Sequence, residues 1–299
     1  MSSTFSFRGT ATAIVTPMLP DTSIDVESLK KLVDFQISNG INGLVPCGTT
    51  GETATLDHSE HHLVMDIVAE QTQGRVPIII GAGSNSTKEA ISLTKHAREI
   101  GANAVLSITP YYNKPTQKGL FEHYKAITDA VDIPVILYNV PSRTGCNMLP
   151  ETVLKIAELP NISGIKEASG NLSQVMEILL HKPKNFTVLS GDDALTLPLM
   201  ALGADGVIST VSNEVPKEFS KMVQLCLEGK FLEARAIHEK LFTLMNLNFI
   251  ETNPIPVKSA LAMMGKIQEM YRLPLAPMSA DNRFTLRRAL EELQLVGKK

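Results

Sequence analysis

The sequence has few cysteines, no block of basic residues and no long apolar run. Its three cysteines, Cys47, Cys146 and Cys226, are an odd number without the spacing of a metal site. We therefore expect no disulfide framework and predict small buried thiols. The net charge of -3 and the lack of any Lys/Arg block argue against a nucleic acid or a membrane surface as the partner. A small-molecule ligand is the better expectation.

A membrane span and a secretory signal are both unexpected. No window reaches the roughly 18 apolar residues that a span requires. The segment MSSTFSFRGT at residues 1–10 lacks a charged stretch followed by an apolar one, which a secretory signal would need. These absences predict a cytoplasmic protein.

Apolar segments of strand length alternate with amphipathic segments of helix length along the chain. Residues 25–40, 86–101 and 150–159 have helical spacing, and several such segments open on an N-cap residue or Pro and close on Gly. Eight segments are strand candidates. They are residues 12–17, 43–48, 76–83, 104–110, 134–140, 162–169, 186–193 and 205–210.

Eight strand–helix units in 299 residues predict an α/β fold of the TIM (β/α)8 barrel type. A doubly wound sheet usually has fewer strands and a recognisable nucleotide loop. The Gly-rich segment 81–86, GAGSNS, ends in serine where a dinucleotide loop has glycine. The pattern therefore predicts a barrel over residues 1–230 and a small C-terminal helical region over residues 231–299.

Polar and reactive residues follow the predicted strands. Barrel enzymes carry their chemistry at the carboxyl ends of the strands, so these segments mark the expected active site. They are GTTGE (48–52), TPYYNKP (109–115), YNVPSRTG (138–145), SGDD (190–193) and Lys166 within the sixth strand. The GTTG turn offers two hydroxyls and exposed backbone N–H groups, which suit a carboxylate, although many tight turns share this composition.

Lys166 is the most informative of these residues. Strand alternation places Gly164, Lys166 and Ala168 on one face, and the two small neighbours leave space around the amine. If that face points into the barrel, loss of hydration favours the neutral amine, which can attack a carbonyl carbon. This interpretation predicts a Schiff-base lysine.

Structural alternatives stay open for both central side chains. Lys166 can form an ion pair with a nearby carboxylate such as Asp192, Asp193 or Glu167, because buried lysines are usually paired. Tyr138, on the preceding strand, is predicted to face the same interior. Its phenol can carry protons between intermediates or can be a core hydroxyl with one partner.

Taken in this order, GTTGE, TPYYNKP, YNVPSRTG and GIKEASGN resemble the dihydrodipicolinate synthase (4-hydroxy-tetrahydrodipicolinate synthase) group of the class I pyruvate-dependent aldolase and lyase superfamily. The resemblance extends from about residue 8 to residue 295, through NPIPVK (253–258) and RLPLAP (272–277). It implies a lyase that condenses pyruvate with L-aspartate 4-semialdehyde, the first committed step of diaminopimelate and lysine biosynthesis.

The resemblance also implies the catalytic residues. Lys166 would form the Schiff base with pyruvate, and Tyr138 would be the proton shuttle. Thr49 and Tyr112 would complete a hydroxyl relay with Tyr138, with Tyr112 reaching in from a neighbouring subunit. The protonated imine is the electron sink, so no metal, flavin or nicotinamide cofactor is expected.

Substrate-binding residues follow from the same resemblance. Thr50 would hold the pyruvate carboxylate with its hydroxyl and backbone N–H. Arg143 would bind the carboxylate of L-aspartate 4-semialdehyde by a charge-assisted pair. Gly191 and Ile208 would line the pocket through backbone atoms.

The histidine-rich segment 57–62, DHSEHH, has two interpretations. Three histidines at helical spacing could bind a metal, but they do not match the H-E-x-x-H or H-x-x-E-H patterns. The resemblance instead implies a subunit-interface site for L-lysine as a feedback inhibitor, in a homotetramer built as a dimer of dimers. The residues implied are Thr53, which replaces a common serine, Ala54, His58, His61, Asn85, Glu89 and Tyr111.

The sequence is also compatible with two other functions. An N-acetylneuraminate or keto-sugar-acid aldolase of the same superfamily would share Lys166, Tyr138 and the threonine turn. Arg143 separates the two enzymes, because a sugar acid presents a polyol rather than a short amino-aldehyde with a carboxylate. The second alternative is a non-catalytic, pyruvate-sensing protein on the same scaffold, which any turnover would exclude.

Overall fold

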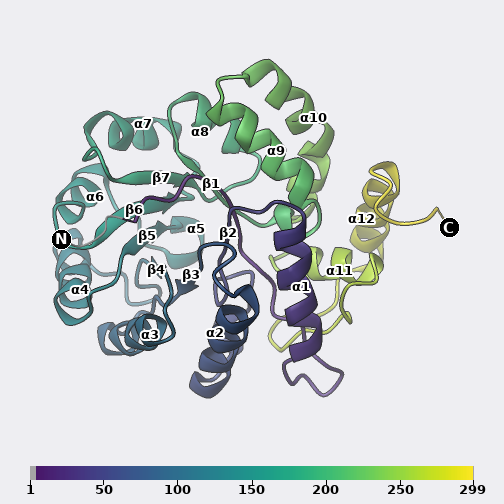
Figure 1. Ribbon diagram of the computed structural model, residues 1–299, viewed down its shortest axis with the longest axis horizontal. Helices are drawn as coiled ribbons and strands as arrows, with labels where there is room; N and C mark the ends of the chain where they lie inside the picture. The colour runs from purple at the N-terminus through teal and green to yellow at the C-terminus, as the bar shows by residue number, and fades with distance from the viewer. Residues whose placement is uncertain (1–4, 299) are drawn as a thin grey trace.

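The computed structural model describes residues 5–298; residues 1–4 of the predicted barrel and Lys299 of the predicted helical region lie outside the described residues. Eight parallel strands form one sheet in the order β2-β1-β8-β7-β6-β5-β4-β3 (Figure 1). Its two end strands meet at a parallel bridge between Leu44 and Ile78, so the sheet is a nearly closed barrel. The TIM-barrel prediction is confirmed. The strands are β1 (Gly9–Thr12), β2 (Gly43–Leu44), β3 (Ile79–Gly81), β4 (Ala104–Ile108), β5 (Val135–Asn139), β6 (Ile162–Glu167), β7 (Thr187–Ser190) and β8 (Gly206–Ser209).

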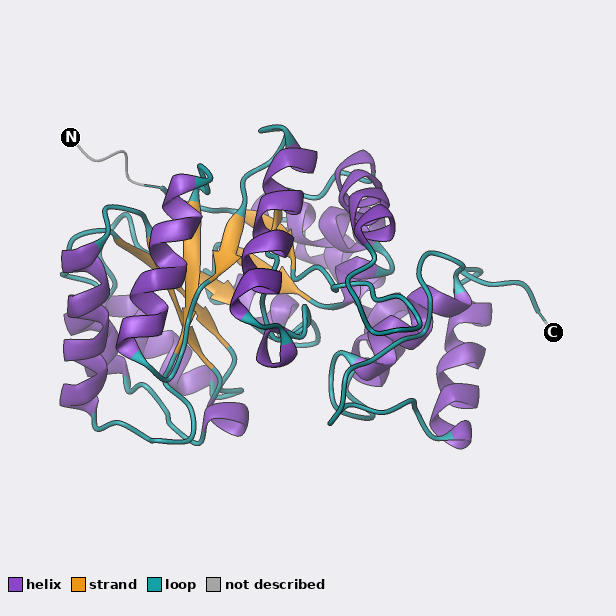
Figure 2. Cartoon of the chain, turned by 90° about the horizontal axis from the view of Figure 1, so that it is seen from below, coloured by secondary structure: helices purple, strands orange, loops and turns teal. Residues whose placement is uncertain are grey.

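Helices connect the strands and continue beyond the last one. The helices next to the C-terminus lie to one side of the strands (Figure 2). No helix within residues 5–298 is long and apolar enough to cross a membrane. The α-helices are α1 (Val26–Ser38), α2 (His58–Thr72), α3 (Thr87–Glu99), α4 (Gln117–Ala130), α5 (Pro141–Thr144), α6 (Pro150–Ile156), α7 (Leu172–His181), α8 (Thr196–Ala201), α9 (Pro216–Leu227), α10 (Phe231–Leu247), α11 (Ile255–Met263) and α12 (Ala280–Glu292), and the short 3₁₀ helices are η1 (Thr53–Thr55) and η2 (Val211–Asn213).

The helix signals in the sequence mark their positions well. In α1 the carboxylate of Asp25 caps the helix by accepting from the backbone N–H of Ser28, and Leu29, Leu32 and Val33 are buried on one face. The predicted boundary at residue 230, between the barrel and the C-terminal helical region, stays a prediction.

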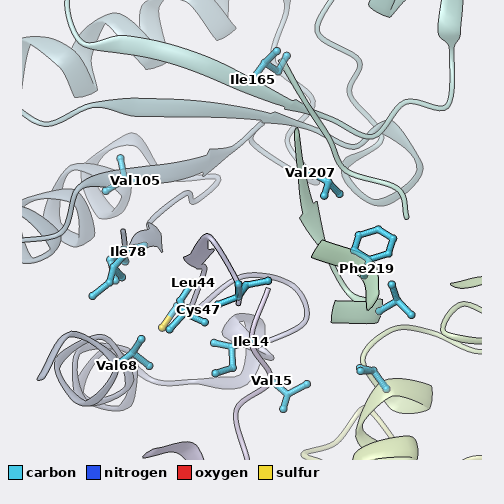
Figure 3. Close-up of a cluster of buried hydrophobic side chains, with 14 of the residues drawn as sticks. Ile14, Val15, Leu44, Cys47, Val68, Ile78, Val105, Ile165, Val207 and Phe219 are labelled. Atoms are coloured by element: carbon cyan, nitrogen blue, oxygen red, sulfur yellow. The ribbon is translucent and has the colours of Figure 1, made fainter. Parts of the chain in front are cut away.

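Apolar side chains cover both faces of the strands, in one layer inside the barrel and one layer outside it. Inward side chains fill the barrel, among them Ala11, Val45, Ile79, Leu106, Ile136, Leu189 and Ile208. Outward side chains belong to a second buried cluster that includes residues of the surrounding helices. Figure 3 shows Leu44, Val105, Ile165 and Val207 of this cluster. Each fully buried aliphatic side chain contributes about 1.5–3 kcal/mol. Because successive side chains of a strand point to opposite faces, this alternation decides which residues of β5 and β6 reach the barrel interior.

The first strand begins earlier than predicted. The pattern placed it at residues 12–17, whereas β1 spans Gly9–Thr12. Of the predicted segment, Ala13 and Ile14 continue the ladder, with backbone N–H bonds of 2.9 and 3.2 Å to the neighbouring strands. The neighbours end at this level, so the rest of the apolar run is buried against helices without strand pairing.

Candidate active site

Strands β5 and β6 bring Tyr138 and Lys166 together inside the barrel mouth. The two residues are directly paired in the strand register. The Lys166 Nζ lies 4.3 Å from the centroid of the Tyr138 ring, and each residue is only 7% exposed. The predicted inward orientation of both side chains is therefore confirmed.

The neighbouring carboxylates do not neutralise Lys166. Glu167 points to the opposite face, where its carboxylate accepts from the amide of Asn139 at 3.1 Å. Asp193 accepts from the backbone N–H of Val211 at 2.7 Å. Within residues 5–298, no carboxylate oxygen lies within 4.0 Å of the Lys166 Nζ, whereas other lysines do form such pairs. The structural ion-pair interpretation of Lys166 is therefore wrong.

A cavity of about 570 Å³ opens over this pair at the carboxyl ends of the strands. Six predicted site residues line it, namely Thr49, Thr50, Tyr138, Arg143, Lys166 and Gly191. Ile208 lies below, in the barrel interior, and is 1% exposed. Residues 249–253, from the chain after the barrel, also line it. A cavity with one buried amine and few convergent polar groups has the character of a small-molecule site.

Glycine at position 191 keeps the space around Lys166 open. A Cβ built on Gly191 would lie 2.6 Å from the Cβ of Ala168 and 3.1 Å from the Cε of Lys166. Contacts this short would displace the lysine stem. The absence of a side chain at position 191 therefore leaves room for the lysine stem.

The threonine turn is held on both sides. The backbone N–H of Glu52 bonds to the carbonyl oxygen of Thr49 at 3.1 Å. The hydroxyl of Thr16 donates to the carbonyl oxygen of Gly51 at 2.7 Å. These bonds fix a compact turn with Thr49 and Thr50 on the cavity wall.

Arg143 is carried by α5, a single turn that follows β5 directly. Pro141 occupies the first turn of this helix, where its missing N–H costs nothing. The Nη2 of Arg143 donates to the carbonyl oxygen of Asn253 at 3.3 Å. A guanidinium has five N–H donors, so its other donors can bind a ligand in the cavity.

Asn253 is a site residue that sequence reasoning did not assign. Its Nδ2 donates to the hydroxyl of Thr50 at 3.0 Å, and it also accepts from Arg143. Asn253 is the first residue of the NPIPVK segment. Its contact with Thr50 could not be predicted from the sequence, because the two residues are 203 positions apart.

Burial shifts the titration of one acid beside the cavity. Desolvation raises the pKa of Asp193 to about 6, and hydrogen bonds from the backbone N–H groups of Val211 and Thr210 and from Ser209 oppose this shift. Asp193 stabilises the start of η2 rather than contacting the cavity, because its carboxylate accepts from Thr210 and Val211.

A second cavity of about 310 Å³ lies beside the first. Thr49 lines both cavities. Six of the residues implied for lysine line the second, namely Thr53, Ala54, His58, His61, Glu89 and Tyr111. Asn85 is not on its wall, and its carbonyl oxygen accepts from the amide of Asn113 at 2.9 Å.

The histidines of the DHSEHH segment do not converge on one point. His58 Nε2 lies 3.1 Å from a carboxylate oxygen of Glu89. His61 Nε2 donates to the carbonyl oxygen of Gly81 at 2.9 Å, and burial lowers its pKa. His62 stacks on His96 at 4.0 Å. The Glu89 carboxylate and the lowered pKa of His61 suit a cationic ligand.

Tyr112 lies outside both cavities of its own chain. It is 88% exposed, and its φ of 72° is rare for a residue with a side chain. One chain alone therefore does not bring this phenol to Lys166. Tyr111, its neighbour, faces the second cavity.

Comparisons with known proteins agree with the fold. The sequence matches the Dihydrodipicolinate synthetase family over residues 6–293. The 4-hydroxy-tetrahydrodipicolinate synthase of Syntrophus aciditrophicus (strain SB) is 52% identical over 291 residues, which cover 97% of this chain and 100% of that protein.

Solved structures agree as well. The chloride-inhibited dihydrodipicolinate synthase of Acinetobacter baumannii complexed with pyruvate has a TM-score of 0.95 and 46% identity, covering 97% of this chain and 99% of that one. The enzyme of Cyanidioschyzon merolae with lysine bound has a TM-score of 0.94 and 41% identity, covering 97% and 99%. The chain therefore belongs to the dihydrodipicolinate synthetase family.

Proposed function

We propose that this protein is a 4-hydroxy-tetrahydrodipicolinate synthase, a lyase that condenses pyruvate with L-aspartate 4-semialdehyde toward diaminopimelate and lysine. The observation that carries this function is the buried Lys166 amine, free of any carboxylate within 4.0 Å in residues 5–298, beside Tyr138 and below Arg143. The name of the Syntrophus aciditrophicus relative and the pyruvate complex of the Acinetobacter baumannii enzyme support it.

The first half of the reaction joins pyruvate to the enzyme. The neutral Nζ of Lys166 attacks the ketone carbon, and loss of water leaves a protonated imine. The Thr50 hydroxyl and backbone N–H hold the pyruvate carboxylate. The Gly191 backbone lies beside the lysine stem and lines this subsite.

The second half forms the new carbon–carbon bond. The imine loses a methyl proton to become an enamine, whose carbon adds to the aldehyde carbon of the second substrate. The amine of the adduct then displaces Lys166 as the ring closes, which restores the free enzyme. Tyr138, Thr49 and a neighbouring subunit's tyrosine at position 112 relay the protons.

The proposed reaction draws on no metal, flavin or nicotinamide cofactor. The positively charged imine nitrogen accepts the electron pair that the methyl carbon releases, so the covalent adduct of Lys166 serves as the electron sink. In this proposal, pyruvate is the only molecule that becomes covalently bonded to the enzyme.

A sugar-acid aldolase is the second candidate, since it would use the same lysine, tyrosine and threonine turn. The guanidinium of Arg143 on the cavity wall favours a second substrate with a carboxylate. The test measures turnover of pyruvate with L-aspartate 4-semialdehyde, coupled to the product's reductase, and cleavage of N-acetylneuraminate in parallel. Turnover of the sugar acid alone would overturn the biosynthetic assignment.

We also propose that L-lysine inhibits the enzyme from the second cavity. The carboxylate of Glu89 and the neutral His61 suit the ammonium groups of the ligand, and the lysine-bound enzyme of Cyanidioschyzon merolae supports this. The site shares Thr49 with the active-site cavity, which gives a bound lysine a direct contact with the relay.

Millimolar lysine is expected to lower the initial rate, and Glu89→Gln to raise the half-inhibitory concentration about tenfold, because one charge-assisted bond is lost. Glu99→Gln is the matched control, since Glu99 lies on the same helix with its side chain 74% exposed. Initial rates that stay constant as lysine is added would contradict the proposal.

We infer that the enzyme works as a homotetramer built as a dimer of dimers. Support comes from the highly exposed Tyr112 and from exposed leucines at positions 172, 180 and 202, which a monomer would leave in water. Sedimentation equilibrium is expected to give four times the chain mass of 32.5 kDa. A monomer with full activity would rule out a relay that spans two subunits.

A further inference from the structure

A buried ion pair joins the threonine turn to helix α11. The side chains of Glu52 and Lys258 are fully buried, and the Lys258 Nζ contacts one carboxylate oxygen of Glu52. The other oxygen accepts from the backbone N–H of Arg272 at 3.4 Å. Both partners of this carboxylate come from the chain after the barrel, although Glu52 itself belongs to the barrel.

Glu52 holds an unusual backbone conformation two residues after Thr50. Its φ is 56°, in the left-handed region that residues with a side chain seldom occupy. Such a conformation persists where the surrounding contacts over-determine it. Anchoring the Glu52 side chain therefore constrains the whole turn, including the direction of the Thr50 hydroxyl and N–H.

The same stretch of chain also touches the turn at Thr50. Asn253 donates to the Thr50 hydroxyl at 3.0 Å and is 5% exposed. It precedes α11, the helix that carries Lys258. Residues 253–258 of the chain after the barrel therefore contact the turn at two points, Thr50 and Glu52.

Stability alone gives little reason for charges at these positions. Desolvation offsets most of the attraction within a buried ion pair, and apolar pairs of similar volume are often as stable. A charge pair is more directional than an apolar contact, and directionality is what a carboxylate-binding turn requires.

We propose that Glu52 and Lys258 are positioning residues that hold the threonine turn in its pyruvate-binding geometry, so that the helical region after the barrel sets the affinity for pyruvate. The inference rests on the proposed function in taking pyruvate as the ligand of Thr50. It assigns no contact with substrate to either residue.

The experiment measures pyruvate affinity without the second substrate. The wild-type enzyme, Lys258→Met and the double variant Glu52→Gln/Lys258→Met are titrated with pyruvate, trapped with borohydride and analysed by mass spectrometry, and thermal unfolding is recorded for each. We expect Lys258→Met to raise the half-saturating pyruvate concentration about tenfold. The double variant is expected to regain thermal stability, because no unpaired charge is buried, while its pyruvate half-saturation stays raised.

Arg287→Met is the matched control, because it removes an ion pair of 3.1 Å with Glu291 within α12, away from the turn. It is expected to leave the pyruvate half-saturation unchanged. Recovery of wild-type half-saturation in the double variant, or an equal shift in Arg287→Met, would overturn the positioning role. A wild-type enzyme that traps no pyruvate would instead overturn the proposed function.

Discussion

Replacing Lys166 with alanine is expected to abolish covalent capture of pyruvate and to lower turnover by about 10⁴-fold or more, since no other lysine within residues 5–298 lines the cavity. Lys166 is buried at the bottom of the active-site cavity, and its Nζ contacts the face of the Tyr138 ring at 4.3 Å. The measurement is borohydride trapping with pyruvate, followed by mass spectrometry of the lysine-containing peptide.

The Lys166→Ala result needs two comparisons. Lys155→Ala changes a lysine on α6 whose Nζ lies over the Phe121 ring at 4.7 Å, outside the cavity, and should keep both adduct and turnover. Tyr138→Phe should keep the adduct but turn over slowly, because only a proton relay is lost. A pyruvate adduct that persists in Lys166→Ala is incompatible with the assigned mechanism.

The centre of the site was predictable because its residues are set by local rules. The alternation along a strand alone places Lys166 inward with Gly164 and Ala168. Parallel pairing of consecutive strands then brings Tyr138 to the same level, as the register between β5 and β6 confirms. Neither inference needs a contact between distant parts of the chain.

The rim of the cavity was not predictable in this way. Asn253 reaches Thr50 across a separation of 203 residues, and no periodicity in the sequence links the two positions. The partners of Glu52 are equally distant along the chain. Long-range packing of a helical region on a barrel depends on surface shape, which a hydrophobic pattern does not encode.

The misplaced first strand has a related cause. Residues 14 and 15 are apolar because they pack against helices, while β1 itself carries threonines at positions 10 and 12 that are fully buried. Thr12 donates to Gln36 at 2.7 Å, so a polar residue is satisfied inside the fold. Hydrophobicity therefore marked the end of the paired segment and the buried residues that follow it, and missed the threonine-containing start of β1.

Arg143→Ala is expected to lower kcat/KM for L-aspartate 4-semialdehyde by about 150-fold while leaving pyruvate trapping intact. Two charge-assisted hydrogen bonds to a carboxylate at a partly open cavity mouth are worth about 3 kcal/mol together, which is about 150-fold. The guanidinium lies on the wall of the same cavity as Lys166, the residue that we propose captures pyruvate. The measurement is steady-state kinetics with each substrate varied in turn.

Arg143→Lys is the informative companion of Arg143→Ala. Lysine keeps the positive charge but loses the planar pair of donors, so we expect kcat/KM between those of the wild type and the alanine variant. Arg143 also donates to the carbonyl oxygen of Asn253 at 3.3 Å, and a purely structural role there would raise the KM for pyruvate through Thr50. An unchanged pyruvate KM with a loss confined to the semialdehyde assigns Arg143 to the second substrate, whereas equal losses for both substrates would assign it to the cavity wall.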